Sequence, residues 1–265
     1  MRRINKRKSS PELVDFCKKE TKPVYEGGLD SLEGYKEHFF KLREQLVEEQ
    51  FAICCYCQQR IEIVKNATPK MKTEHFLPKN IYNGNNGYED LSLEYGNLLA
   101  ACLGNTNNVT HCDSSKGGKV LQNVPNPATN DFDLFKMKYI AYTKPSNFIN
   151  RRESDRFVNV RALNHEVIES ETDEQRKRQF QANDPLVGTN EGCLNLNHQS
   201  LASSRAYTWH GVLRIFASKI KGDWKSEAGK KLARQLVEKF RTPKDGKLEE
   251  FSQVIVDLLV KEFKI

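Results

Sequence analysis

The sequence predicts a mainly helical α+β protein in which a small zinc-stabilised module lies between an N-terminal helix and a C-terminal helical region. Three observations support this fold class: amphipathic helical patterns at both ends of the chain, a middle stretch rich in turn-forming residues, and a cluster of cysteines in that stretch. We therefore expect an N-terminal arm and helix over 1–50, the module over 51–125, and a mainly helical region over 126–265.

The bulk composition limits the class of protein. The net charge is +7, from 42 Lys and Arg residues against 35 Asp and Glu residues, which is compatible with a polyanionic partner without requiring one. No apolar run is long enough for a membrane span, and the basic start, MRRINKRKSS, lacks the apolar stretch of a secretory signal. We therefore expect a cytoplasmic protein with no membrane partner, whose cysteines do not form structural disulfides.

The N-terminal part predicts two helices. In SPELVDFCKKE, Ser10 can cap a helix and Pro11 can occupy its first position. In SLEGYKEHFFKLREQLVEEQ, apolar residues recur at spacings of three and four and form one face of a second helix: Leu32, Tyr35, Phe39, Leu42 and Leu46. These helices are expected to belong to the scaffold core or to dock on another subunit.

Residues 51–120 contain too many turn formers to bury a large core, as in NGNNGYED and DSSKGGK, so a metal ion is the economical way to hold them together. Cys54 and Cys57 form a C-x-x-C knuckle, which presents two thiolates to one zinc ion. Cys102 and Cys112 supply two further thiolates, and two neighbouring residues are alternatives to them: Cys55 and His111. A site closed by four thiolates is structural.

The C-terminal part predicts a strand pair followed by helices. LFKMKYIAYT alternates as a strand does, and RFVNVRAL is its expected partner. Helices are predicted for SETDEQRKRQF, TWHGVLRIFASKI, EAGKKLARQLVEKF and KLEEFSQVIVDLLVKEF. CLNLNHQSLASSR is expected to begin a helix near Asn197 or Ser200, with a phosphate contact by Arg205 as the alternative.

A second group of polar residues lies between and after the two cysteine pairs. Glu74 and His75 are followed by Pro78 in EHFLP, Asn97 precedes a leucine, and Asp113 directly follows a cysteine. This order, bracketed by cysteines, resembles the motif of the HNH endonucleases, whose fold is the ββα-metal nuclease fold. The resemblance implies an enzyme, an endonuclease that hydrolyses phosphodiester bonds, with the module as its HNH unit.

The resemblance also implies a role for each residue. His75 stands where the family has its general base, and Asn97 where it has the residue that orients that base. Glu74 and Asp113 stand where it has ligands of a catalytic divalent cation, Mg²⁺ or Mn²⁺. Three lysines are expected to contact nucleic acid: Lys79, Lys116 and Lys119. The sequence departs from the family pattern in two places. Glu74 replaces the commoner Asp or His, and the second cysteine pair, Cys102 and Cys112, is widely spaced.

The residue types suit this chemistry. Carboxylate oxygens are the ligands that Mg²⁺ prefers, and a neutral imidazole can take a proton from water near neutral pH. The imidazole of His75 must be held in the right orientation. The amide or the carbonyl of Asn97 is expected to do this through a hydrogen bond with the imidazole nitrogen that does not take the proton. Zinc bound by sulfur would instead pin the loops that carry the two halves of the site.

The arrangement over roughly residues 1–215 is similar to PtuB, the HNH subunit of Septu anti-phage defence and of certain retron systems. The similarity is carried by MRRINK, the C-x-Y-C knuckle, EHFLPK, YGNLL, a cysteine-rich loop ending in KGG, and LNLNHQSLASSR. It implies a bacterial defence effector that works with an ABC/SMC-type ATPase, PtuA. In retron systems it further implies a reverse transcriptase and its multicopy DNA as partners.

Two other interpretations remain at this point. One is a non-catalytic zinc-binding module that recognises nucleic acid or protein, which would show zinc and salt-sensitive binding without metal-dependent cleavage. The other is a thiol redox protein that uses Cys54 and Cys57 and does not need His75. The residues leave open whether the substrate of a nuclease is DNA or RNA.

Overall fold

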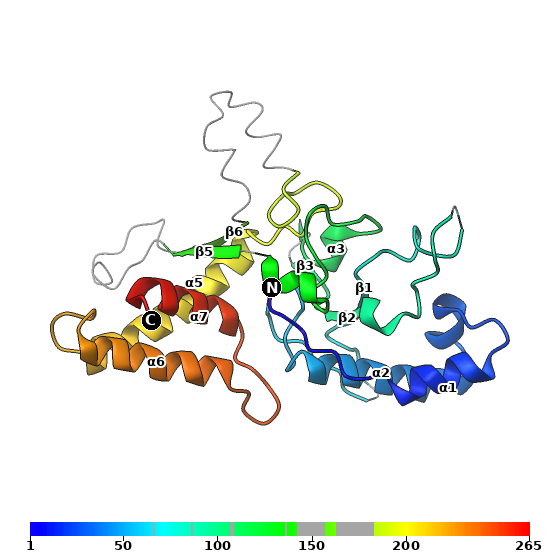
Figure 1. Cartoon of the computed structure of the whole chain (residues 1–265), viewed down its shortest axis with the longest axis horizontal. Coiled ribbons are helices and arrows are strands. Elements are labelled where there is room, and N and C mark those ends of the chain that lie inside the picture. The colour runs from blue at the N-terminus through cyan, green and yellow to red at the C-terminus, as the bar shows by residue number, and fades with distance from the viewer. Residues whose placement is uncertain (66, 86, 107–108, 136, 142–156, 163–182) are drawn as a thin grey trace.

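The computed structural model describes residues 1–65, 67–85, 87–106, 109–135, 137–141, 157–162 and 183–265. The N-terminal helices and the cysteine-rich segments lie on one side of the molecule, and the three long C-terminal helices lie on the other (Figure 1). Within the described ranges far more residues lie in helices than in strands, and each strand pair is small, so the structure is the helix-rich α+β mixture that the sequence predicts. None of the helices in these described ranges is long and apolar enough to cross a membrane.

The N-terminal arm carries two helices. Helix α1 (Pro11–Lys19) begins as predicted, because the Ser10 side chain accepts a hydrogen bond from the backbone N–H of Leu13. Helix α2 (Lys36–Glu49) begins later than predicted: a π turn η1 (Tyr25–Leu29) and a 3₁₀ turn η2 (Glu33–Tyr35) precede it, and Leu32 is 42% exposed. The apolar face of α2 is therefore shorter than the sequence pattern.

The middle of the chain contains short elements only. Strand β1 (Lys72–His75) pairs antiparallel with β2 (Leu98–Ala101), so that His75 lies opposite Leu98 at the end of the pair. A 3₁₀ turn η3 (Tyr95–Asn97) leads directly into β2. A second hairpin, β3 (Asn105–Thr106) with β4 (Val109–Thr110), separates β2 from the four-residue helix α3 (Asp113–Lys116), and the 3₁₀ turn η4 (Asn130–Leu134) follows.

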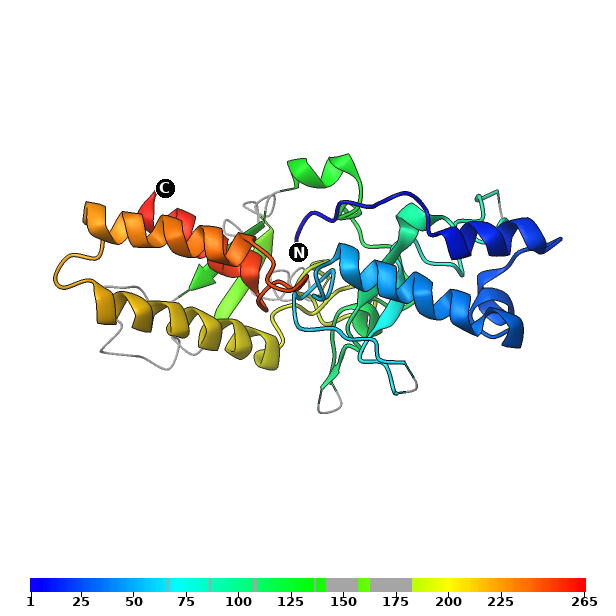
Figure 2. The same ribbon diagram turned by 90° about the horizontal axis from the view of Figure 1, so that it is seen from below.

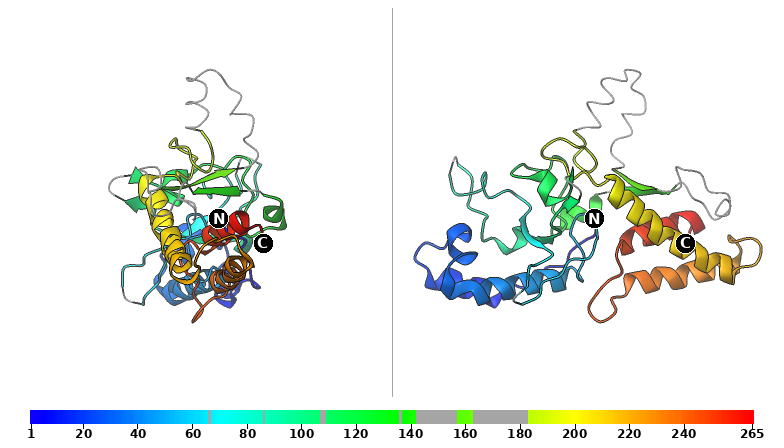
Figure 3. Two further views of the ribbon diagram at one scale, coloured as in Figure 1. Left: turned by 90° about the vertical axis from the view of Figure 1, so that its left-hand side faces the viewer. Right: turned by 180° about the vertical axis from the view of Figure 1, so that it is seen from behind.

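The C-terminal region contains the predicted strand pair, β5 (Met137–Ala141) with β6 (Val158–Ala162), and the helices α5 (Gln199–Lys219), α6 (Glu227–Arg241) and α7 (Ser252–Phe263). Helix α7 lies between α6 and the strand pair, and α5 contacts both α7 and β6 (Figures 1, 2 and 3). His198 is the N-cap of α5, rather than Asn197 or Ser200. The helix predicted for SETDEQRKRQF lies outside the described residues.

The two sides of the molecule are joined by backbone hydrogen bonds as well as by apolar contacts. The N–H of Leu248 donates to the carbonyl of Phe51 at 3.0 Å, and the N–H of Phe251 donates to the carbonyl of Gln58 at 3.1 Å. The buried side chain of Met1 belongs to the same apolar cluster as residues of both sides. The cysteine knuckle is thereby fixed to the segment that leads into α7.

Candidate functional site

Four buried cysteines form a potential metal site. The sulfur atoms of Cys54, Cys57, Cys102 and Cys112 all lie within 4.8 Å of one another. The first two come from the turn that follows α2, the third follows β2, and the fourth is the residue before α3. No other such group is found among the residues that the structure describes. The C-x-x-C knuckle and the second cysteine pair therefore meet at one point.

The hairpin between Cys102 and Cys112 accounts for their wide spacing. The chain leaves through Gly104, pairs as β3 and β4, and returns with the N–H of His111 bonded to the carbonyl of Gly104 at 2.8 Å. Gly104 has a φ of +64°, and a Cβ there would lie 2.2 Å from the carbonyl oxygen of His111. Only glycine fits this turn, which brings Cys112 back to Cys102.

The protonation of the cysteines fits a cation-binding set. Burial acts to raise the pKa of Cys54, but hydrogen bonds from the surrounding thiols outweigh it and hold that pKa well below its ordinary value. Burial raises the pKa of Cys57 and Cys112 well above the ordinary value. Zinc binds thiolates, so binding at this set would release the protons of those thiols that remain protonated. The set could hold a structural metal such as zinc.

The two alternatives to this set lie beside it. Cys55 is buried and burial raises its pKa, but it does not belong to the group of four. Its backbone N–H donates to the carbonyl of Ala100, which ties the knuckle to β2. The Nδ1 atom of His111 lies 3.2 Å from the sulfur of Cys112 and 3.9 Å from that of Cys102, in contact with the cluster.

A cavity of about 350 Å³ contains the other group of candidate residues. Glu74 and His75 reach it from the end of β1, and Asp113 reaches it from the first residue of α3. The complete lining is Tyr25, Thr73, Glu74, His75, Pro78, Lys79, Asn80, Asp113, Lys116, Gly117 and Gly118. Two carboxyl groups and an imidazole thus face one hollow, which borders the turn after α3 and the N-terminal π turn.

The pKa values of the two carboxyl groups are shifted in opposite directions. Burial, followed by the hydrogen bond with Asp113, raises the pKa of Glu74 well above its ordinary value. Burial acts to raise the pKa of Asp113 as well, but the hydrogen bond from Glu74 and the charge of Lys72, whose Nζ lies 3.1 Å from Oδ2, lower it. Asp113 therefore ionises more readily than Glu74.

Glu74 is anchored by two donors on one oxygen. Its Oε1 accepts hydrogen bonds from the hydroxyl of Tyr56 at 2.7 Å and from Nζ of Lys116 at 2.8 Å. The side chains of Glu74 and Lys116 are only 2% and 1% exposed. A buried carboxyl held in this way keeps its position, because any other rotamer would break both hydrogen bonds away from water.

The imidazole of His75 is set in the tautomer that a general base needs. Its Nε2 lies 2.9 Å from the carbonyl oxygen of Ser92, and a carbonyl only accepts, so Nε2 carries the proton. Burial is the main cause that lowers the pKa of His75, so the ring is neutral at neutral pH. Nδ1 is then the nitrogen with a free lone pair, and it makes no hydrogen bond to the described part of the chain.

Asn97 does not hold the imidazole. Its Oδ1 accepts from the N–H of Leu77 at 2.7 Å, and its Nδ2 donates to the carbonyls of Leu77 and Leu91 at 2.9 and 3.0 Å. Its own carbonyl accepts from the N–H of Phe76. The prediction that Asn97 orients His75 through a ring nitrogen is wrong, because the ring has the Ser92 carbonyl as its partner. Asn97 instead closes the loops on either side of the histidine.

The three predicted lysines differ in exposure. Lys116 is buried and also donates to the carbonyl of His75 at 3.0 Å, so it is an internal cation of the site rather than a contact for nucleic acid. Lys79 lines the cavity, with its Nζ 2.6 Å from Oε2 of Glu26. Lys119 is exposed and lies 3.9 Å from Glu191. Two of the three are placed where a phosphate could reach them.

Arg205 is a structural residue. Its Nε donates to the carbonyl of Val158 at 2.8 Å, and its Nη2 donates to Oδ1 of Asn197 at 3.3 Å. The side chain is buried where β6 meets α5. The interpretation of this segment as a helix start is consistent with these bonds, whereas a phosphate contact is not.

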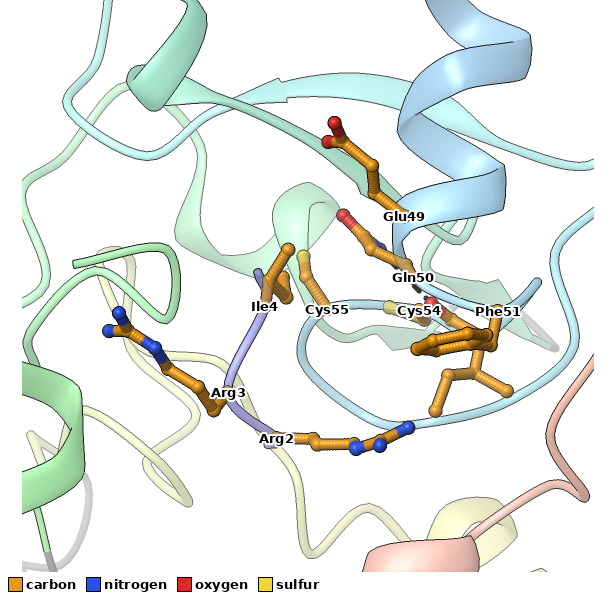
Figure 4. Close-up of a pocket in the computed structure, with 9 residues that line it drawn as sticks. Arg2, Arg3, Ile4, Glu49, Gln50, Phe51, Cys54 and Cys55 are labelled. Carbon is orange, nitrogen blue, oxygen red and sulfur yellow. Dashed lines mark hydrogen bonds between the residues drawn. The ribbon is translucent and has the colours of Figure 1, made fainter. Parts of the chain in front are cut away.

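A second hollow beside the cysteine knuckle is too small to be a binding site. Its volume is about 10 Å³, which is close to the space that one water molecule occupies. Figure 4 shows the N-terminal segment crossing the knuckle there, with the side chains of Arg2 and Arg3 extending in different directions. The guanidinium groups do not converge on a common point, so they do not form an anion site.

Comparison with known proteins adds one similarity. No family model matches the chain. Over 111 residues it is 32% identical to the "Retron Ec83 putative HNH endonuclease" of Escherichia coli, a match that covers 40% of this chain and 39% of that relative. This similarity supports the HNH endonuclease family. It supports a nuclease function in general, and the chain spans well under half the length of the HNH relative that it matches.

Three residues of the site were missed by the sequence analysis. Ser92 contributes only a backbone carbonyl, which any residue could supply. Tyr56 lies inside the knuckle, where its hydroxyl reaches Glu74. Tyr25 reaches the cavity from the N-terminal arm, 50 residues before His75. Among these, only Tyr56 had a sequence clue, since a polar aromatic residue between two candidate zinc ligands is placed close to whatever they hold.

Proposed function

We propose that this protein is a metal-dependent HNH endonuclease that hydrolyses phosphodiester bonds of nucleic acid. The observation that carries the proposal is the shared cavity of Glu74, His75 and Asp113, in which the imidazole is neutral and its Nε2 proton is held by a carbonyl. The similarity to a retron HNH endonuclease supports the same conclusion independently of the cavity. A zinc-binding module without catalysis would need none of these three side chains.

His75 is the proposed general base. A water molecule in the cavity would give its proton to Nδ1 while Nε2–H stays bonded to the Ser92 carbonyl, which also stabilises the imidazolium that forms. The hydrogen bond from Lys116 to the backbone carbonyl of His75 holds the strand end in place during this transfer. The base is thus fixed through both its ring and its main chain.

Glu74 and Asp113 fit a divalent cation. They are hard oxygen donors that lie in mutual contact and line the same cavity, so one dication could be bound by both. A bound Mg²⁺ or Mn²⁺ supplies neutralisation of the scissile phosphate and stabilisation of the leaving oxygen. Lys72 and Lys116 remain as the second neighbours of the carboxylates and limit their mutual repulsion.

The cysteine cluster is proposed as a structural zinc site. Cys112 is followed directly by Asp113, and Cys102 directly follows β2, which pairs with the strand that carries Glu74 and His75. Zinc at this point would therefore fix the separation of the two carboxylates without taking part in hydrolysis. The roles of 51–125 as the nuclease module and of 126–265 as a helical scaffold follow from the same arrangement.

The finer assignment is a defence effector. The name of the Escherichia coli relative places that protein in a retron, and the similarity to PtuB adds an ABC/SMC-type ATPase and, in a retron, a reverse transcriptase with its multicopy DNA as partners. Lys79 and Lys119 are the proposed contacts for the nucleic-acid backbone, because Lys79 is partly exposed and lines the cavity, and Lys119 is exposed two residues after Gly117 of the lining. DNA and RNA substrates are both compatible with this chemistry.

The test uses the purified chain with Mg²⁺ or Mn²⁺, alone and with the ATPase of its own operon, against plasmid DNA and tRNA. We expect His75→Ala to abolish cleavage while zinc content and unfolding temperature stay at the values of the unmodified protein. His38→Ala is the matched control, since His38 lies on α2 and pairs with Asp15. Full cleavage by His75→Ala would overturn the proposal, and salt-sensitive binding without cleavage would favour the non-catalytic zinc module.

A further inference from the structure

Tyr25 places an aromatic ring against the proposed base from outside the nuclease module. Its ring centroid lies 4.5 Å from that of His75, and the two planes meet at 88°. The side chain is buried and lines the cavity. A nearly perpendicular pair at this distance is the arrangement that aromatic rings prefer.

The π turn that carries Tyr25 is firmly held. The N–H groups of Leu29 and Asp30 donate to the carbonyls of Val24 and Tyr25 at 3.1 and 3.2 Å. Gly27 has a φ of +75°, which allows the tight turn between them. Leu29 is fully buried, so the turn is tied to the N-terminal arm at both ends.

The ring of Tyr25 is also fixed from behind. It makes a second perpendicular contact with Phe39 of α2, at 6.0 Å between centroids. A Cβ at Gly28 would lie 3.3 Å from Cζ of Phe16, so the turn packs closely on α1 as well. The position of Tyr25 relative to His75 is therefore set by two helices that contribute nothing else to the cavity.

The hydroxyl of Tyr25 does not act as a base. Burial raises the pKa of Tyr25 to about 12, so the phenol stays protonated at any pH at which a nuclease works. The contact of Tyr25 that bears on His75 is therefore the one made by its ring. The hydrogen bond from Nε2 to Ser92 fixes one point of the imidazole, and a ring held at one point can still tilt about that bond.

We propose that Tyr25 is a positioning residue that removes this tilt and holds Nδ1 of His75 toward the water that is to be activated. The N-terminal arm then completes the active site rather than serving only as scaffold. This inference rests on the proposed function of His75 as the base. It assigns to Tyr25 an effect on turnover rather than on substrate binding, because the ring touches the base directly, whereas Lys79, 5.7 Å from its centroid, keeps its ion pair with Glu26 when the ring is removed.

The test compares three variants of the full chain under the metal and partner conditions in which it cleaves. Tyr25→Leu is expected to lower kcat about 3- to 10-fold at unchanged KM, the range that one aromatic pair corresponds to. Tyr25→Phe keeps the ring and is expected to restore the kcat of the unmodified protein. Tyr25→Met fills the space with a flexible chain and should behave as Tyr25→Leu, so the test survives poor folding of either variant.

Tyr35→Leu is the matched control. Tyr35 also belongs to the N-terminal arm and also makes a perpendicular contact with a histidine, His38, at 5.2 Å. It does not line the cavity. If Tyr35→Leu lowers kcat as much as Tyr25→Leu, the effect comes from loss of arm stability and the proposal is overturned. A rise in KM alone, or an unchanged kcat in Tyr25→Leu, overturns it as well.

A readout without catalysis separates this inference from the proposed function. In ring-labelled histidine NMR spectra, with His75 assigned from its substitution, Tyr25→Leu is expected to broaden or split the His75 signal, whereas Tyr25→Phe leaves it single. One unchanged sharp signal in both variants would refute the positioning role even if the protein cleaves. A split signal in a protein that cleaves nothing would keep the positioning role and remove the nuclease.

Discussion

The module around the cysteines and the C-terminal helices are held together by different means. In the module, β1 and α3 have four residues each, which is too short for secondary structure to persist without other support. In the C-terminal region, α5, α6 and α7 have 21, 15 and 12 residues and bury aromatic side chains between them. Phe216 stacks on Phe263 at 4.6 Å between centroids. Both regions bury apolar side chains, but the module adds a buried cysteine cluster and buried polar contacts to its short elements, whereas the C-terminal region relies on the packing of its long helices.

The same contrast appears in the buried charges. The module buries Glu74 and Lys116 directly beside the cavity, whereas the C-terminal region buries Arg205 against backbone and amide oxygens far from it. Buried ion pairs contribute little net stability, because desolvation offsets their attraction. Their position beside His75 therefore indicates a role in the site. The part of the chain that carries the proposed site is thus the part that combines an apolar core with buried polar and sulfur groups.

The largest effect is expected from removing a zinc ligand. Cys54→Ser should abolish zinc binding and unfold the module, because a structural zinc ion contributes about 10 kcal/mol or more to the folding of such units. We expect cleavage to disappear while most of the helical circular-dichroism signal remains, since α5, α6 and α7 need no metal. Metal analysis together with limited proteolysis, with new cuts within 51–125, would show this.

Cys17→Ser is the control for that experiment. Cys17 lies on α1, outside the group of four, and its substitution should leave zinc content and cleavage unchanged. If Cys54→Ser instead removes the entire helical signal, the two regions fold as one unit and the contrast between them is false. The backbone bonds from Leu248 to Phe51 and from Phe251 to Gln58 are the contacts through which such coupling would pass.

A substitution in the C-terminal core is expected to have a smaller effect, which lowers the stability of the helices and leaves the cysteine cluster unchanged. Phe216→Ala removes a fully buried ring that also stacks on Trp224, and should cost about 3–5 kcal/mol of unfolding free energy in urea titrations. Zinc content should not change. Tyr207→Ala on the same helix is the control, because that side chain is 74% exposed and its loss should cost less than about 0.5 kcal/mol. Loss of zinc in Phe216→Ala would contradict the separation of the regions.

The difference between the regions also decides what the sequence could predict about the fold. The start of α1 was predictable because Ser10 and Pro11 act within the helix itself. The β5–β6 pair and α6 were predictable from local patterns and are confirmed. The late start of α2 was not, since Leu32 fits the helical period and yet the π turn that carries Tyr25 redirects the chain before it. Contacts made far along the chain overrode the local pattern there.

For the site, the order of residue types in the sequence predicted which residues lie together, but it did not predict their hydrogen-bond and ion-pair partners. The sequence indicated that Glu74, His75 and Asp113 belong together, and all three line one cavity. It could not indicate that Lys116 turns inward, because its partner Glu74 lies 42 residues earlier and only the fold joins them. The carbonyl that holds His75 could not be predicted either, since backbone groups look alike at every position.

The smallest effect is expected at the mouth of the cavity, where neither metal nor apolar burial contributes. The Glu26–Lys79 ion pair is solvent-exposed, with side chains 76% and 38% exposed, so Glu26→Gln should change the unfolding free energy by less than about 1 kcal/mol. The same change frees Lys79 for a substrate phosphate, and we expect a His75→Ala background to bind a labelled oligonucleotide about two- to fivefold more tightly at low salt, with the gain vanishing at high salt. Glu33→Gln, which removes the same charge from a carboxylate paired with Lys36, should give no such gain. Equal gains in both variants would mean that net charge, and not Lys79, sets the affinity, and the cavity mouth would then lose its part in substrate binding.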